Sequence, residues 1–315
     1  MTTDICPELY INEAEIIINS INIFDYICCR RSEKYKNIAN LYKNAGNLYK
    51  MKDLKLSYDS YEKSLLYFSK IPNNNEKNIA DCYINCALTC DKQYHEKIIN
   101  YYIKAIEIYL LLELNNKIPK FYENIADIYL SMNDFNNAIL YYEKVCKKND
   151  VIDNYDSILK KEEIYNKIGV IYIVNMNDYE KGLEAYKKYE LLYNKNNVPD
   201  NFCNNYVNYK KYFIIIVLLY LLKKDYTKTL VLLDYYETIC KYLKKDYFIL
   251  YDLIRNIQNY NVEKYDIDDN IERRENRERI IISLLKEIIS KYNNILIKNI
   301  INKIFFDTCN KNNII

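Results

Sequence analysis

Three cysteines and the single histidine of the chain form the one cluster whose residue types are typical of a metal site. Cys82, Cys86 and Cys90 are four residues apart, which places their thiols on one face of a helix, and His95 follows. Thiolate and imidazole groups are the usual ligands of structural zinc. The alternative is a buried helix face, because a free cysteine behaves as a small apolar residue. The sequence favours the buried face, and we expect no metal and no cofactor.

The composition gives little support to other chemistry. Three glycines in 315 residues leave almost no room for glycine-rich phosphate loops, and one histidine leaves one imidazole base. No motif pairs a nucleophile with its base. Lys and Arg total 45 against 43 Asp and Glu, so the chain lacks the basic excess of a nucleic-acid-binding protein. We therefore expect a protein that is not an enzyme and does not bind nucleic acid.

The ends and the apolar runs predict a cytoplasmic protein. The first fifteen residues, MTTDICPELYINEAE, lack the basic and apolar regions of a signal peptide, so the ten cysteines are expected to be reduced. The longest apolar run, Tyr212 to Leu222, has eleven residues, whereas a membrane span needs about 20. We interpret this run as a buried helix.

A repeat of about 40 residues organises most of the chain. Its marker is a small residue, at Gly46, Ala87, Ala126 and Gly169, followed three residues later by Tyr in three copies and by Cys90 in the other. A short polar turn ending in Asp and an aromatic residue leads to a second helix. Small residues let two helices approach and aromatic residues fill the grooves, as in tetratricopeptide-like hairpins.

The repeat predicts an all-α fold, a right-handed tetratricopeptide-like solenoid of helical hairpins with a C-terminal helical bundle. A fifth and more apolar copy spans Tyr209 to Tyr236, with Asp225 and Tyr226 at its turn, and the repeat fades after about Tyr247. We expect the solenoid to occupy residues 1–205 and the bundle to occupy residues 206–315.

The repeats resemble the soluble NSF attachment proteins, the SNAP adaptors of membrane fusion. The resemblance covers about residues 10–290, with further matches in family order at Lys211, at Tyr260 and from Arg279 to Lys286. The segments that carry it are Ala39 to Met51, Tyr102 to Tyr109, Asn124 to Tyr129 and Asn137 to Glu143. The first half is most similar to the alpha type, while the segments around Tyr209 and Asp225 also resemble the gamma type.

The resemblance implies an adaptor without chemistry of its own. Members of the family bind the assembled SNARE helical bundle, of syntaxin type, through a concave basic face. Their C-terminal end recruits and stimulates the hexameric NSF-type AAA ATPase, which disassembles the SNARE complex during vesicle fusion and ER–Golgi protein transport. The implied location is the cytosolic face of membranes, by peripheral contact. A generic tetratricopeptide-like scaffold for another protein complex is the alternative.

The first site that the resemblance implies is a membrane loop between the first two helices. Its apolar members are Ile23, Phe24, Tyr26 and Ile27. Arg30 and Arg31 follow them, and cations beside apolar residues suit an anionic bilayer surface. The alternative is that these residues continue the first helix and belong to the core.

The second implied site is a set of lysines for the SNARE bundle. Lys120 aligns with a family lysine at a helix start, just after Pro119. The next family position holds Glu163, a reversal of charge, and Lys160, Lys161 and Lys167 lie one turn to either side as substitutes. The alternative is an ordinary solvated helix face, where an ion pair adds little stability.

The third implied site is the ATPase contact, a leucine pair at Leu284 and Leu285. The acidic pair of the family aligns with Gln258 and Asn259, so Asp266, Asp268 and Asp269 are expected to supply the negative surface instead. Seven of the twelve residues from Arg279 to Ser290 are apolar, which is too many for one narrow helix stripe. We therefore expect some of them to stay exposed after folding.

Overall fold

The computed structural model describes residues 6–23, 25, 30–72, 75–149, 155–195, 206–239, 244–263 and 271–309. Every regular element in these ranges is a helix, and none of the described residues lies in a strand. The all-α prediction is confirmed. The chain divides into two compact units, Met1–Asp153 and Asn154–Ile315. The predicted boundary at 205/206 falls between two helices of the second unit and stays a prediction.

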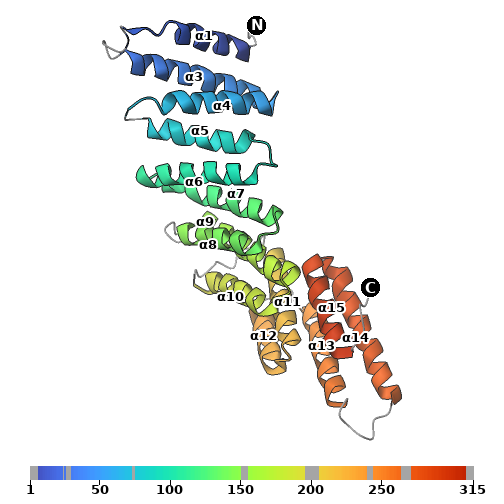
Figure 1. Ribbon diagram of the computed structural model, residues 1–315. Helices are drawn as coiled ribbons and strands as arrows, with labels where there is room; N and C mark the ends of the chain where they lie inside the picture. Colours follow the sequence, from blue (N-terminus) through green and yellow to red (C-terminus); the bar gives the residue numbers. More distant parts are fainter. Residues whose placement is uncertain are drawn as a thin grey trace, which may run out of the picture. The chain divides into compact units, whose positions relative to one another are not determined.

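The first unit is a stack of helical hairpins (Figure 1). Helix α1 packs on α3, then α3 pairs with α4, α5 with α6 and α7 with α8, and the hairpins stack through α4 on α5 and α6 on α7. The elements are α1 (Pro7–Asn19), α3 (Arg31–Tyr49), α4 (Leu54–Phe68), α5 (Glu76–Thr89), α6 (His95–Leu111), a 3-10 turn (Asn115–Lys117), α7 (Ile118–Ser131) and α8 (Phe135–Asn149).

The small residue makes room for a tyrosine of the following helix in the two repeats where it is glycine. A Cβ atom on Gly46 would lie 2.9 Å from Cε1 of Tyr61, which is fully buried and donates a hydrogen bond to Asn47 Oδ1 at 2.6 Å. In the second unit a Cβ atom on Gly169 would lie 2.5 Å from Cε2 of Tyr186, which is also fully buried. The repeat marker therefore records a close approach of two helices.

The Asp-aromatic turns are helix N-caps. Oδ1 of Asp134 accepts a hydrogen bond from the backbone N–H of Asn137 at 3.1 Å, and Asp225 caps α12 in the same way through Lys228. The residue before each cap, Asn133 or Lys224, has a φ of 58° or 59°, the left-handed conformation that ends the preceding helix. These two positions together reverse the chain at a hairpin.

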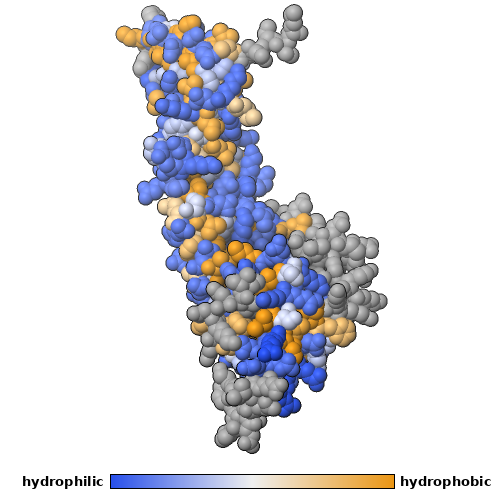
Figure 2. Space-filling view, turned by 90° about the vertical axis from the view of Figure 1, so that its right-hand side faces the viewer, coloured by the Kyte–Doolittle hydropathy of each residue, from blue (hydrophilic) through white to orange (hydrophobic). Residues whose placement is uncertain are grey.

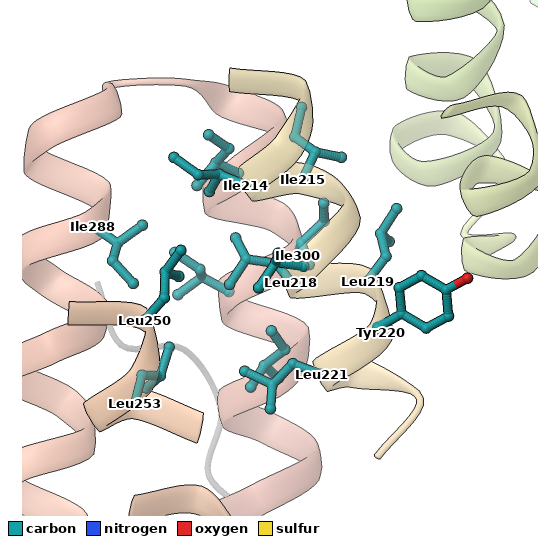
Figure 3. Packing of buried hydrophobic residues seen from close by; sticks show 14 of the residues in the cluster. Ile214, Ile215, Leu218, Leu219, Tyr220, Leu221, Leu250, Leu253, Ile288 and Ile300 are labelled. Atoms are coloured by element: carbon teal, nitrogen blue, oxygen red, sulfur yellow. The ribbon is translucent and has the colours of Figure 1, made fainter. Parts of the chain in front are cut away.

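The second unit surrounds one apolar helix. Residues 212–221 of α11 are all buried, and Ile214 and Leu218 face Leu250, Ile288 and Ile300 of the neighbouring helices (Figure 3). The apolar run is a core helix as predicted, and no described helix has the length and apolarity to cross a membrane. The elements are α9 (Tyr155–Val170), a π-helical turn (Ile171–Asn175), α10 (Tyr179–Lys195), α11 (Tyr206–Leu222), α12 (Tyr226–Ile239), α13 (Lys244–Glu263), α14 (Ile271–Tyr292) and α15 (Ile295–Cys309).

Candidate interaction surfaces

The predicted membrane loop lies beyond the end of α1. The Ile23 side chain is 77% exposed, so at this position the structure does not support the core interpretation. Phe24, Tyr26 and Ile27 lie outside the described residues. Asp25, by contrast, is buried, and its position is fixed by the helix that follows.

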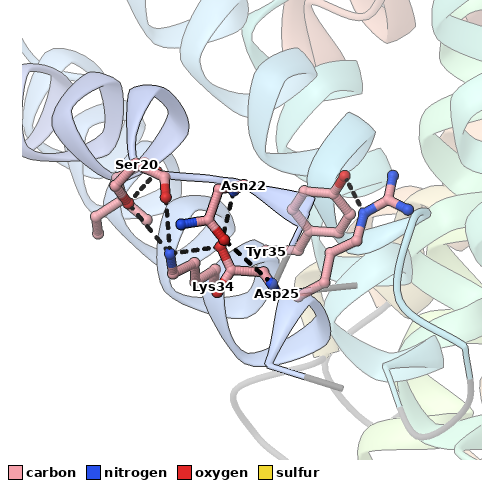
Figure 4. A network of polar contacts seen from close by, with 7 residues as sticks. Ser20, Asn22, Asp25, Lys34 and Tyr35 are labelled. Carbon is pink, nitrogen blue, oxygen red and sulfur yellow. Dashed lines mark hydrogen bonds and ion pairs between the residues drawn. The ribbon is translucent and has the colours of Figure 1, made fainter. Parts of the chain in front are cut away.

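A polar network holds the base of this loop (Figure 4). Nζ of Lys34 lies 2.8 Å from Oδ2 of Asp25 and donates to the Ser20 carbonyl oxygen at 3.0 Å. The backbone N–H of Asn22 donates to the same Asp25 oxygen at 2.9 Å. The Lys34 and Asn22 hydrogen bonds hold the pKa of Asp25 below its usual value. The network ties the end of α1 to α3 and leaves Ile23 projecting.

Lys120 projects from the first turn of α7. Its side chain is 65% exposed, and its Nζ lies 3.0 Å from Oε2 of Glu123, whose side chain is only 3% exposed. The buried carboxylate anchors the ammonium group at one end, so the position of the cation is set by the fold. The structure therefore presents Lys120 at the surface of α7.

The lysines predicted on α9 fall into two groups. Lys160 and Lys167 lie 2.8 Å and 3.4 Å from carboxylate oxygens of Glu163, so the reversed charge at Glu163 has a cation on either side. Lys161 is buried, with 6% of its surface exposed. Two of the three substitutes thus reach the surface, and the third is part of the packing of α9.

The leucine pair on α14 is divided between core and surface. Leu285 is fully buried with Ile281 in the apolar core of the second unit, whereas Leu284 is only partly buried against it. The clearly exposed apolar residue of the segment is Ile280, at 39%. Asp266, Asp268 and Asp269 lie outside the described residues.

The cysteine cluster is a buried helix face. Cys82 and Cys86 are fully buried and Cys90 is nearly so. Burial raises the pKa of Cys82 to about 11 and that of Cys86 further, which disfavours the thiolate that a metal needs. Within the described ranges no group of His, Cys, Asp and Glu has the arrangement of a metal site.

Two surface features had no part in the sequence predictions. A groove of ≈1360 Å³ runs along the ends of α4 to α7, with exposed Leu54, Leu88 and Tyr94 on its walls. Apolar side chains also mark the surface of the first unit in Figure 2. The second feature is a set of cations over tyrosine rings on α3 and α4, including Lys63 and Lys70. The sequence signal that could have indicated this second feature is the helical spacing of lysines and tyrosines along α4.

The stacked hairpins define a helical repeat protein of the tetratricopeptide-like class. Residues 6–270 match the family of the soluble NSF attachment proteins, SNAP. This match covers most of the chain, and the chain belongs to the SNAP family. Ile23, Lys120 and the α9 lysines lie inside the matched residues. Asp266, Asp268 and Asp269 also lie inside them, whereas Leu284 and Leu285 lie beyond them, so the match includes the acidic part of the predicted ATPase contact and not its leucine pair.

Other comparisons add only distant similarities. No individual curated protein matches the sequence. BtubC (BKLC) from P. vanneervenii is 17% identical, with 75% of this chain and 91% of that chain covered and a TM-score of 0.42. Aspartyl phosphate phosphatase F from Bacillus subtilis is 16% identical, with coverages of 84% and 61% and a TM-score of 0.41. Likenesses at these TM-scores carry no functional argument.

Proposed function

We propose that this chain is an adaptor of SNARE disassembly. It binds assembled SNARE complexes and recruits and stimulates an NSF-type AAA ATPase, which supplies the ATP hydrolysis. The observation that carries the proposal is the SNAP family match over residues 6–270. Within the family we assign the alpha type, because the first half of the chain resembles it most, and we assign a role in ER–Golgi vesicle transport.

The SNARE contact in this proposal is made by one exposed lysine and two partly exposed lysines. Lys120 on α7 and Lys160 and Lys167 on α9 offer ammonium groups at the surface, each beside a glutamate that fixes its position. The surface cations of either unit attract an acidic rod of helices and orient it, more than they add to affinity. Lys161 is buried and has a supporting role in α9 rather than a contact.

The ATPase contact in this proposal lies in the C-terminal bundle, residues 206–315. Its apolar part is the outer face of α14, where Ile280 is exposed and Leu284 is partly so. Leu285 supports this face from the core. The acidic residues Asp266 and Asp268, with the neighbouring Asp269, supply the negative surface for the hexameric partner.

The membrane contact places the adaptor at the cytosolic face of the bilayer. Ile23 projects from a base fixed by Lys34 and Asp25, and Phe24, Tyr26 and Ile27 complete the apolar set. A projecting apolar side chain on a rigid base loses little conformational freedom when it enters the lipid interface. The contact is peripheral and reversible.

A pull-down tests the proposal directly. The full chain is immobilised and offered a preassembled syntaxin-type SNARE bundle, with or without an NSF-type ATPase. We expect the bundle to be retained alone, and the ATPase to be retained with ATP hydrolysis stimulated when the bundle is present. A chain that retains neither protein contradicts the adaptor function, and a generic tetratricopeptide-like scaffold then becomes the better assignment.

A further inference from the structure

Cations and tyrosines interleave where the start of α3 meets the end of α4. The rings of Tyr35 and Tyr67 lie 5.6 Å apart between centroids. Nζ of Lys70 lies 4.7 Å from the Tyr67 centroid and 5.6 Å from that of Tyr35. The Arg31 guanidinium lies 4.9 Å from the Tyr35 centroid. A cation over an aromatic face is attracted by the ring quadrupole, so these side chains hold each other in place.

The members of this cluster that reach the surface run along the last turns of α4 and into the turn that follows it. Lys63, Leu66 and Tyr67 are three and four residues apart, which is the spacing of one helix face, and Lys70 lies in the turn directly after the end of α4 at Phe68. Both lysines are exposed, and Leu66 is 51% exposed between them. We call these four residues the α4 stripe. It alternates cations with an apolar residue and a half-buried aromatic residue.

The lysines of the α4 stripe are not occupied by carboxylates. Among the described residues, neither Lys63 nor Lys70 forms an ion pair, although Lys34 nearby does so with Asp25. Lys63 instead lies over the ring of Tyr42, 5.2 Å from its centroid. Burial, then Tyr67 and then Glu15, raise the pKa of Tyr42, so Glu15 is the acidic group that acts on this ring. The two ammonium groups remain available to an outside anion.

The α4 stripe lies at the same edge of the first unit as Ile23. The end of α1, the start of α3 and the end of α4 lie together, and Ile21 packs with Tyr35 and Tyr67 in one apolar cluster (Figure 1). Exposed charged residues here are mostly cations, and the exposed acids are Glu15 near the end of α1 and Glu33 in the first turn of α3. The exposed cations are Arg30, Lys36, Lys63 and Lys70.

We infer that the α4 stripe is a second membrane-contact element, which binds the headgroups of anionic phospholipids beside the apolar loop. Amphipathic side chains of this kind bury their apolar parts at the lipid interface and keep their charges at the headgroups. The cations would make the contact selective for anionic lipid, whereas Ile23 would act on any bilayer. This inference rests on the proposed peripheral membrane contact and adds the class of lipid and the residues that select it.

The test is flotation of the full chain with vesicles of phosphatidylcholine alone and with one-third phosphatidylserine. We expect tighter binding to the anionic vesicles. The variant Lys63→Gln with Lys70→Gln should lower that binding by about 25-fold, at roughly fivefold per lysine near an anionic surface, and leave binding to neutral vesicles unchanged. High salt should remove the additional binding that the anionic lipid causes, because salt screens exposed charges.

The matched control is Lys55→Gln with Lys92→Gln. Both lysines are exposed and without an ion pair among the described residues, and they lie at the opposite helix ends. We expect wild-type binding. A control that loses as much as the stripe variant overturns the inference, because net charge alone then explains the effect. The circular dichroism melts of both variants should match the wild type, since the changed side chains are at the surface.

The outcomes separate the inference from the membrane contact on which it rests. Equal wild-type binding to neutral and anionic vesicles overturns the role of the α4 stripe and leaves the apolar contact of Ile23 in place. Wild-type binding to neither vesicle overturns both. A stripe variant that binds vesicles normally but loses the SNARE bundle in solution also overturns the inference, because the surface then serves an acidic protein.

Discussion

Replacing Leu285 with alanine tests whether the C-terminal leucine pair works as surface or as core. Leu285 is fully buried and belongs to the same apolar cluster as Ile281, Ile288 and Leu218 of α11. Truncation would remove apolar contacts and leave a cavity, which for a buried leucine costs about 2–5 kcal/mol of unfolding free energy. The structure therefore predicts that Leu285→Ala acts first on the stability of the second unit.

The size of this effect can be stated as a melting temperature. For a domain of 150–250 residues, 1 kcal/mol shifts the midpoint by about 2–4 °C, so a loss of ~3 kcal/mol gives roughly 6–12 °C. The matched control on the same helix is Ile280→Ser. Because Ile280 is 39% exposed, its replacement should cost less than about 1 kcal/mol. Thermal melts followed by circular dichroism and urea unfolding measure both.

The functional arm uses stimulation of an NSF-type ATPase well below the melting temperature. Ile280→Ser should reduce stimulation without a change in melting, whereas Leu285→Ala should stimulate in proportion to its folded fraction. Binding of the SNARE bundle should survive in both variants. If Leu285→Ala melts like the wild type and yet loses stimulation, Leu285 contacts the ATPase directly and the reasoning from burial is refuted.

Three further predictions concern packing, charge and pH. Gly169→Ala should lower the melting temperature, because a Cβ atom 2.5 Å from the fully buried Tyr186 ring costs about 1–3 kcal/mol and outweighs a helix-propensity gain of about 1 kcal/mol; a higher melting temperature would contradict the close approach. Lys120→Gln should slow association with the SNARE bundle and weaken its salt dependence in stopped-flow measurements, and an unchanged rate would remove Lys120 from the contact. Burial above all raises the pKa of Tyr61 and Tyr109 to about 12, which favours the neutral phenols in the folded state; stability should therefore hold up to about pH 10 and fall as the pH rises towards 12. Urea unfolding between about pH 10 and pH 12 measures this loss of stability. Ionisation of Tyr61 and Tyr109, seen as tyrosinate absorbance at pH 10 while the helices persist, would contradict the prediction.

The hairpins were predictable because their signals are local. A small residue and a polar turn that ends in Asp are read from one stretch of chain, and in the structure Asp134 caps its helix directly after the left-handed Asn133. The partner of the small residue was less accessible. The sequence marked the tyrosine three residues later, Tyr49 after Gly46, whereas the ring that occupies the space above Gly46 is that of Tyr61, on the next helix.

The state of α14 could not be read from its own residues. Its apolar positions exceed one stripe, and the choice between them depends on α13 and α15, which pack against it from elsewhere in the chain. Leu285 is buried because those helices cover it, while Ile280, five residues earlier, is left exposed. Family resemblance pointed to the pair as a unit, and tertiary packing separates its two members.

Lys161 shows that the position of a residue along a helix can decide its burial more strongly than its residue type does. Ser157, Lys161, Ile164 and Ile168 follow one another at four, three and four residues, and all four are buried on one face of α9. Lys160 lies a quarter turn away and remains partly exposed. The spacing is visible in the sequence, whereas the residue type alone predicts an exposed side chain, because lysine is rarely buried. On α4 the same spacing separates the buried Ser57, Tyr61 and Ser64 from the exposed Lys63 and Leu66, so the position of a side chain relative to the buried face of its helix decides whether it can meet a partner.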